Sequence, residues 1–185
     1  MSDVELQSAL LLTVPAAEAA VGPHRARLDS NARDGVPAHL TVLYPFLPPA
    51  EIGPDALAGL SRLFAGIPRF AFTLDRVRWF GEAVVWLGPS DEAPFRALTE
   101  LAVEAYPGCS PYGGIYEDVV PHLTIGHGGD LADLRAAAEA VRPLLPIATE
   151  ATEVTLMAGP KPDQPEGLLR RPSDNWHTVA SFPLG

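Results

Sequence analysis

The sequence predicts an α+β protein made of two similar lobes, and three observations support this fold class. First, 185 residues suffice for one large domain or two small lobes, but not for two ordinary domains. Second, short apolar runs alternate with amphipathic stretches along the chain, with Gly and Pro between them. Third, one tetrapeptide recurs, as His-Leu-Thr-Val at residues 39–42 and His-Leu-Thr-Ile at residues 122–125. We therefore expect one domain over residues 1–185, with an internal duplication.

Apolar runs bounded by turn residues predict seven strands. They span residues 9–14, 39–44, 70–74, 84–87, 122–125, 154–157 and 178–182. Gly81 is expected in the turn between the third and fourth strands, and Gly126 is expected to end the fifth.

Amphipathic stretches between these strands predict four helices. The first of these helices is expected to end near residue 30. The other three are expected at residues 54–66, 90–107 and 130–143. Gly22 and Pro23 interrupt the first helix, and residues 31–35 form a polar loop after it. Ser90 and Asp130 are the expected N-caps of the last two helices. The order is then β-α-β-α-β twice, with one strand left over, which gives two pseudo-symmetric lobes.

Composition limits the classes of function. Thirteen Lys and Arg against 23 Asp and Glu give a net charge of −10, which argues against a protein that coats long nucleic acid. One RNA end or one nucleotide in a local pocket stays compatible with that charge. The lone Cys109 excludes an internal disulfide framework and a cysteine-based zinc site. The acidic first residues and the lack of a long apolar stretch predict a cytoplasmic protein with no membrane contact.

The repeated His-x-Thr pattern is the strongest functional signal. Residues i and i+2 of a strand point to the same face, so each motif places an imidazole beside a hydroxyl while the leucine between them faces a core. If two related lobes face each other, His39, Thr41, His122 and Thr124 line one cleft.

Two imidazoles and two hydroxyls suit phosphoester chemistry without a metal. A neutral His can take a proton from an attacking hydroxyl or water, and a protonated His can give one to the departing oxygen. The threonine hydroxyls can donate hydrogen bonds to the non-bridging phosphate oxygens. The pattern does not tell which His is the acid. The alternative is that both His are edge-of-strand residues whose hydrogen bonds are satisfied within the protein.

Other candidate residues are weaker. His127 is expected on the opposite face, in a turn; His24 is expected on the surface, and His177 opens the last strand. Glu117 and Asp118 are expected in a solvated loop, because a straight strand would hold Asp118 about 13 Å from His122. Further candidates are aromatic rings near the motifs, which could stack on a base, and one arginine pair. They are Tyr44, Phe46, Tyr112 and Tyr116, and Arg170 with Arg171.

The sequence resembles the 2H phosphoesterase superfamily, which is named for two H-x-T motifs. Within it, the sequence is most similar to the bacterial 2'-5' RNA ligases, also described as RNA 2',3'-cyclic phosphodiesterases. The likeness spans nearly the whole chain and includes residues 38–46, the strand ending at Trp86, residues 120–124 and the closing residues 182–184. It implies a bilobal fold in which antiparallel sheets flank a central cleft. It also implies that His39 and His122 are the catalytic pair, that Thr41 and Thr124 bind phosphate, and that no metal or cofactor takes part.

The expected function is therefore a metal-independent opening of 2',3'-cyclic phosphates, with 2'-5' RNA ligation as a further activity. The expected partner is a small cyclic nucleotide or an RNA 3' end, because the chain has few basic residues. We expect a monomer. Two alternatives stay open, namely a nucleotide-binding or sensing module with negligible turnover, and a metallohydrolase that uses the His residues as ligands.

Overall fold

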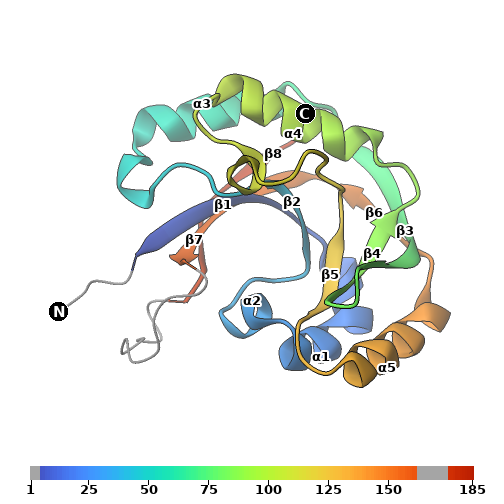
Figure 1. Ribbon diagram of the computed structural model, residues 1–185. Helices are drawn as coiled ribbons and strands as arrows, with labels where there is room; N and C mark the ends of the chain where they lie inside the picture. The colour runs from blue at the N-terminus through green and yellow to red at the C-terminus, as the bar shows by residue number, and fades with distance from the viewer. Residues whose placement is uncertain (1–4, 162–174) are drawn as a thin grey trace.

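The computed structural model describes residues 5–161 and 175–185, which form two four-stranded antiparallel sheets with helices around them (Figure 1). We call the sheet with strand order β2-β1-β7-β8 sheet A, and the sheet with strand order β5-β4-β3-β6 sheet B. The strands of sheet A are β1 (Leu6–Thr13), β2 (His39–Leu43), β7 (Glu153–Pro160) and β8 (His177–Pro183). Those of sheet B are β3 (Phe70–Phe80), β4 (Val84–Pro89), β5 (Leu123–His127) and β6 (Ile147–Ala151).

Helices cover the sheets on two sides. In Figure 1, α3 and α4 lie at the top, and α1, α2 and α5 lie at the bottom. Their bounds are α1 Glu18–Leu28, α2 Ser30–Arg33, α3 Pro54–Ala65, α4 Ala93–Ala105 and α5 Leu131–Val141. Four short 3₁₀ turns complete the elements of the described part of the chain: Pro15–Ala17, Pro49–Glu51, Pro111–Gly114 and Arg142–Leu144. None of the described helices is long and apolar enough to cross a membrane.

Both sheets contribute to one hydrophobic core. Leu40 and Val42 of β2 lie in the same buried cluster as Leu123 and Ile125 of β5. β2 and β5 are the edge strands of their sheets, and they pack against each other. The alternate residues of each strand, among them Thr41 and Thr124, therefore face away from this core.

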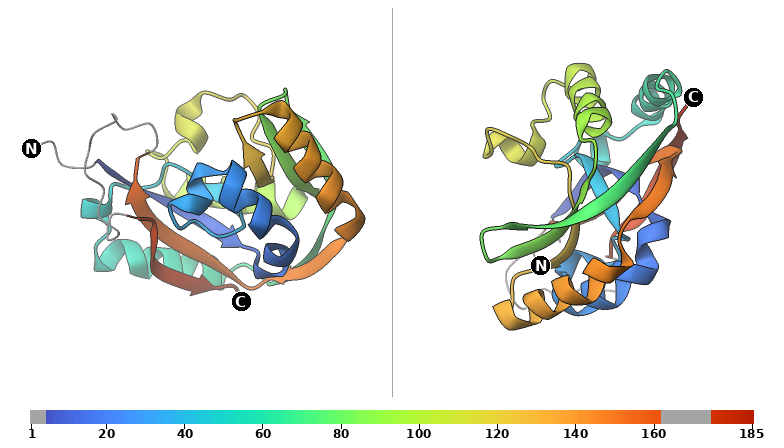
Figure 2. Two further views of the ribbon diagram at one scale, coloured as in Figure 1. Left: turned by 90° about the horizontal axis from the view of Figure 1, so that it is seen from below. Right: turned by 90° about the vertical axis from the view of Figure 1, so that its right-hand side faces the viewer.

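The α+β fold class with antiparallel sheets is confirmed, but the sheets do not divide the chain into a first and a second half. β3 was expected in the first lobe, yet it pairs with β4 and β6 in sheet B. Residues 147–151 form a strand that the sequence did not indicate, because Ala and Glu are poor strand formers and the pairing with β3 determines the outcome. The long β3–β4 hairpin is visible in Figure 2.

Several local predictions need correction. α1 continues through Pro23, because the residue that loses its hydrogen-bond donor, Ala19, is exposed and water can satisfy its carbonyl. Residues 31–33, expected in a loop, belong to α2, which has Asp29 as its cap. Ser90 is not the cap of α4, which begins at Ala93, whose N–H donates to Asp91 at 2.9 Å.

Two other local predictions are confirmed. Gly81 lies in the β3–β4 turn with a φ of 56°, and Asp130 caps α5 by accepting a hydrogen bond from the N–H of Ala132 at 2.8 Å. These signals depend on short sequence contexts, so tertiary packing does not override them.

Candidate functional site

The two His-x-Thr motifs lie at the edges where the sheets meet. His39 and Thr41 are on β2, Thr124 is on β5, and His122 directly precedes β5. All four side chains are half-buried, while the leucine between each pair is buried in the core. Strand alternation therefore places both imidazole–hydroxyl pairs on the faces turned away from the core, as expected.

Each imidazole is held by the same local hydrogen bond. Nδ1 of His39 lies 2.7 Å from the carbonyl oxygen of Pro37, and Nδ1 of His122 lies 2.8 Å from that of Val120. A carbonyl oxygen can only accept, so Nδ1 carries a proton in both rings. In the neutral ring Nε2 then has the free lone pair, which is the form that a base requires.

Burial keeps both imidazoles neutral near pH 7 in the ligand-free protein. Desolvation lowers the pKa of His39 to about 4, although the hydrogen bond to Pro37 acts in the opposite direction. The charge of Arg25 lowers this pKa further and that of Asp29 raises it, while a charge on His122 also lowers it. Burial also lowers the pKa of His122, to which the charge of His127 adds.

A buried ion pair lies beside His39. Arg25 lies in the last turn of α1 and is 2% exposed, and Asp29 directly follows α1 and is 1% exposed. A guanidinium nitrogen of Arg25 lies 2.9 Å from a carboxylate oxygen of Asp29. Arg25 also donates to the carbonyl of Val36 at 3.2 Å. The pair therefore anchors the segment that leads into β2. The sequence did not indicate it, although the i, i+4 spacing of opposite charges was a usable signal.

A tyrosine from the segment after α4 contacts the first motif. The phenol of Tyr112 forms a hydrogen bond with the Thr41 side chain. The Tyr112 backbone has a φ of 49°, and its N–H donates to the carbonyl of Tyr44 at 2.5 Å. Burial raises the pKa of the Tyr112 phenol, whereas the hydrogen bond with Thr41 acts in the opposite direction.

His122 instead lies against two aromatic rings. Its ring centre is 5.0 Å from that of Phe80 and 5.8 Å from that of Trp86, both edge to face. Phe80 and Trp86 are stacked with their centres 4.7 Å apart. Among the described residues, the indole nitrogen of Trp86 is the buried side-chain nitrogen or oxygen that lacks a hydrogen-bond partner.

His127 does not behave as expected. The β4–β5 ladder pairs Trp86 with Thr124 but Val85 with Gly126, so β5 contains one extra residue at this point. The register then pairs His127 with Val84 and returns His127 to the Thr124 face. His127 is exposed and belongs to the strand rather than to a turn.

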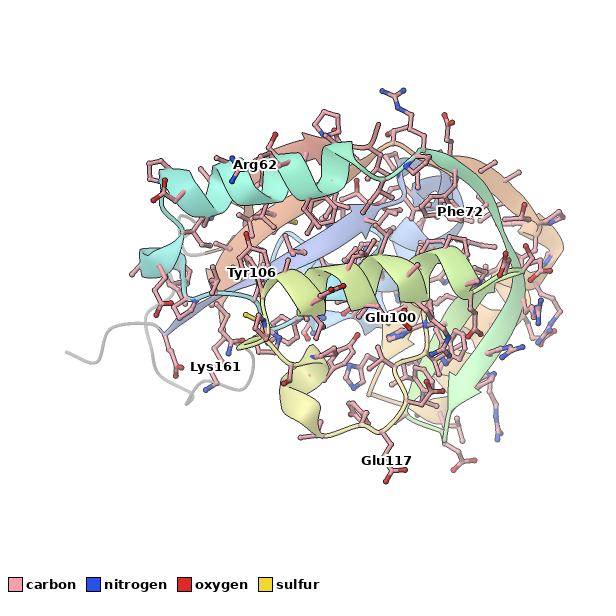
Figure 3. All side chains as sticks on the ribbon, turned by 90° about the horizontal axis from the view of Figure 1, so that it is seen from above. Arg62, Phe72, Glu100, Tyr106, Glu117 and Lys161 are labelled. Carbon is pink, nitrogen blue, oxygen red and sulfur yellow. The ribbon has the colours of Figure 1, made fainter. Side chains whose placement is uncertain are left out.

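The remaining candidates lie apart from the motifs. His177 opens β8, three strand spacings or about 14 Å from β2, and His24 is half-buried on α1. Asp118 is bound to Arg96 at 2.7 Å rather than solvated alone, and this contact lowers the pKa of its carboxyl. Glu117 points away from the sheets (Figure 3). Arg170 and Arg171 lie outside the described residues.

The environment of the site has two further features. A pocket of about 620 Å³ lies between residues 45–51 and 105–113, and none of the four motif residues lines it. In the part of the chain that the structure describes, no three His, Cys, Asp or Glu side chains gather as a metal-binding group.

Comparison with known proteins identifies relatives in both sequence and fold. The model of the 2'-5' RNA ligase superfamily matches residues 13–161. Comparison with the curated proteins gives no match.

Solved structures share the fold over nearly their whole length. LigT of E. coli, crystallised with 3'-AMP, is 22% identical with a TM-score of 0.56, and the match covers 97% of this chain and 98% of that one. The complex of the same protein with ATP is 25% identical with a TM-score of 0.51, covering 98% and 99%. TT0787 of Thermus thermophilus is 17% identical with a TM-score of 0.59, covering 96% and 97%.

Proposed function

This chain belongs to the 2'-5' RNA ligase superfamily, and from that premise we propose that it hydrolyses 2',3'-cyclic phosphates of nucleotides or RNA ends. The observation that carries the proposal is the matched state of the two imidazoles. Both donate through Nδ1 to a backbone carbonyl, and both therefore have Nε2 free for proton transfer. A protein that only binds nucleotides does not need this arrangement.

In the proposed reaction, one neutral imidazole takes a proton from water at Nε2. The water oxygen forms a bond to phosphorus while the bond from phosphorus to the 2' or 3' oxygen breaks. The other imidazole, protonated at Nε2, gives its proton to that leaving oxygen. Thr41 and Thr124 donate hydrogen bonds to the non-bridging oxygens as negative charge develops on them.

The phosphate itself supports the protonated imidazole that this reaction needs. In the ligand-free protein the pKa values of both His residues are low because the rings are desolvated. An anion that binds between the rings favours the charged form and raises the pKa of the nearer ring. The substrate therefore converts one neutral imidazole into the acid.

The proposed substrates are small. The complexes of E. coli LigT with 3'-AMP and ATP support a site of nucleotide size in this fold. The net charge of −10 also favours one nucleotide or one RNA end over a long strand. By reversal of the acid and base roles, the same site can form a 2'-5' linkage, which we include as a second activity.

Phosphorus NMR of a nucleoside 2',3'-cyclic phosphate, with EDTA present, tests the proposal. The wild type is expected to convert the cyclic phosphate into a monoester, and the chemical shift identifies the isomer. His39→Ala and His122→Ala are expected to give no product on the same timescale. His177→Ala is the matched control, because it removes an exposed imidazole at the far edge of sheet A.

Three results would contradict the proposal. Loss of turnover in EDTA that returns on adding a divalent metal would favour a metallohydrolase. Tight nucleotide binding without any product, also with RNA ends and 2'-5' linkages, would favour a binding module. Full activity of either His variant would exclude the two-histidine mechanism.

A further inference from the structure

Sheet B carries a row of side chains that continues the site beyond the second motif. Directly opposed residues of an antiparallel ladder point to the same face. Thr124 is opposed to Trp86, and Trp86 is opposed to Arg78. The hydroxyl, the indole and the guanidinium therefore lie in line across β5, β4 and β3, on the face that also holds the His122 ring.

The Trp86 indole contacts both Arg78 and His122. The guanidinium carbon of Arg78 lies 5.9 Å from the centre of the Trp86 ring. The centre of the His122 ring lies 5.8 Å from the centre of the same Trp86 ring. Phe80, two residues after Arg78, stacks on Trp86 and remains 37% exposed. The strip from His122 to Arg78 is thus an apolar floor with a cation at its far end.

Gly88 makes room for this floor. A Cβ atom on Gly88 would lie 3.2 Å from the Trp86 ring and 3.7 Å from Cδ of Arg78. The missing side chain lets the indole and the Arg78 stem lie against the β4 backbone. This packing directs the Arg78 side chain along the sheet rather than leaving it free to turn in all directions.

The Arg78 guanidinium has no anion among the described residues. The nearby arginine Arg76 is bound to Asp75 at 2.9 Å and to the carbonyl of Ser90 at 3.1 Å. Glu82, in the hairpin turn, lies 3.6 Å from Arg135. In a chain of net charge −10, an exposed cation that adjoins the site and has no carboxylate partner in the described part of the chain is available to an anionic ligand.

We infer that Arg78 binds a second phosphate of the substrate, on the 5' side of the nucleotide whose 3' phosphate lies between the two His-x-Thr motifs. This inference rests on the proposed function, because it takes the reacting phosphate to lie at the motifs. Two strand spacings, about 10 Å, separate the backbones of Thr124 and Arg78, and the long arginine side chain covers part of that span. Arg78 would thus select 5'-phosphorylated nucleotides or RNA ends over unphosphorylated nucleosides.

Calorimetric binding of stable product analogues tests the inference without requiring turnover. Adenosine 3'-phosphate and adenosine 3',5'-bisphosphate are titrated into the full chain at low salt. The wild type is expected to bind the bisphosphate about tenfold more tightly, as one charge-assisted contact allows. Arg78→Gln is expected to bind the two ligands within about twofold of each other, because it lacks the cation.

Arg62→Gln is the matched control. Arg62 is also exposed and forms no ion pair among the described residues, but it lies on α3 (Figure 3). This variant is expected to keep the preference of the wild type. A dinucleotide with a 3' phosphate is the third ligand of the experiment. If the wild type binds it more tightly than adenosine 3'-phosphate and Arg78→Gln does not, the second phosphate belongs to an RNA end. A preference limited to the bisphosphate identifies a mononucleotide.

Equal binding of both monomeric ligands by the wild type would overturn the inference, as would an unchanged preference in Arg78→Gln or no binding of either ligand. These outcomes are separate from those of the NMR experiment. Hydrolysis without a 5'-phosphate preference would reject only the Arg78 subsite. A preference lost in Arg78→Gln, without hydrolysis, would reject only the proposed reaction.

Discussion

At the scale of single residues, the two imidazoles share one hydrogen bond but not their surroundings. His39 lies beside the buried Arg25–Asp29 pair, whereas His122 lies against Phe80 and Trp86. In both places burial disfavours the charged ring, so the pKa is lowered. Both rings are thus neutral in the ligand-free protein near pH 7, and the proposed reaction requires protonation of one of them.

This arrangement predicts an acidic optimum for kcat/KM, which reports the free enzyme. The reaction needs one neutral and one protonated ring. The pKa of His39 is lowered to about 4 and that of His122 is also lowered, so this state becomes rare once the pH exceeds the higher of the two pKa values. We expect kcat/KM for a cyclic nucleotide to fall about tenfold per pH unit above that point. Initial rates between pH 4 and pH 9 measure the profile, and a maximum near pH 8 would contradict it.

The sequence was sufficient to predict the motif residues, but not the residues that support them. His39, Thr41, His122 and Thr124 occur in a repeated pattern with strand periodicity, so their shared face follows from local rules. Tyr112 reaches Thr41 only because the segment after α4 crosses to β2. Arg78 likewise joins the row only through the register of the β3–β4 hairpin. Such contacts depend on pairing between strands, which one sequence does not specify.

At the scale of elements, the bulge in β5 explains the position of His127. A strict period of two places residue 127 on the face opposite to Thr124. The register shift between the Val85 and Trp86 pairs adds a residue to β5 and reverses that relation. Gly126 lies at the shift and faces α1 and α5, where a Cβ atom would come within 2.7 Å of Leu134 and 3.0 Å of Leu28.

Gly126→Ala should therefore destabilise the protein. Leu134 contacts the added methyl through a flexible end, but the Leu28 contact is at Cβ, which yields less. Overpacking of this kind lowers the free energy of unfolding by about 1–3 kcal/mol. Urea denaturation followed by circular dichroism measures the change. Gly108→Ala is the control, since a Cβ atom there meets nothing within 4 Å, and a loss no larger than that of the control would contradict the packing argument.

Elements with strong local signals were predicted, and the others were not. α3 and β4 were recognised because their apolar periodicity is clear, and the ends of α3 are marked by Pro54 and Gly66. β6 was missed because its sequence has low strand propensity and is held by its pairing with β3. The extension of β3 to Phe80 has the same cause, since its last residues continue the ladder with β4.

At the scale of the whole molecule, sheet A contains the first two and the last two strands of the described chain, and sheet B contains the four between them. In both sheets the strand of the His-x-Thr motif is the edge strand. It pairs with the strand before it in the chain, β2 with β1 and β5 with β4, and helical segments connect the two strands of each pair. This correspondence agrees with an internal duplication, which stays a prediction. The alternation of strands and helices predicted the fold class, whereas the return of the chain to sheet A could not be inferred from periodicity.

The central claim is that one imidazole from each sheet acts in a single reaction. Two groups that act as one unit do not have additive effects. The most direct test compares kcat/KM for a 2',3'-cyclic nucleotide among the wild type, His39→Ala, His122→Ala and the double variant, with folding checked by circular dichroism. We predict that each single substitution lowers kcat/KM about 10²–10⁴-fold, and that the double variant is little worse than the worse single variant. Losses that multiply in the double variant, or a single variant at the wild-type rate, would contradict the account.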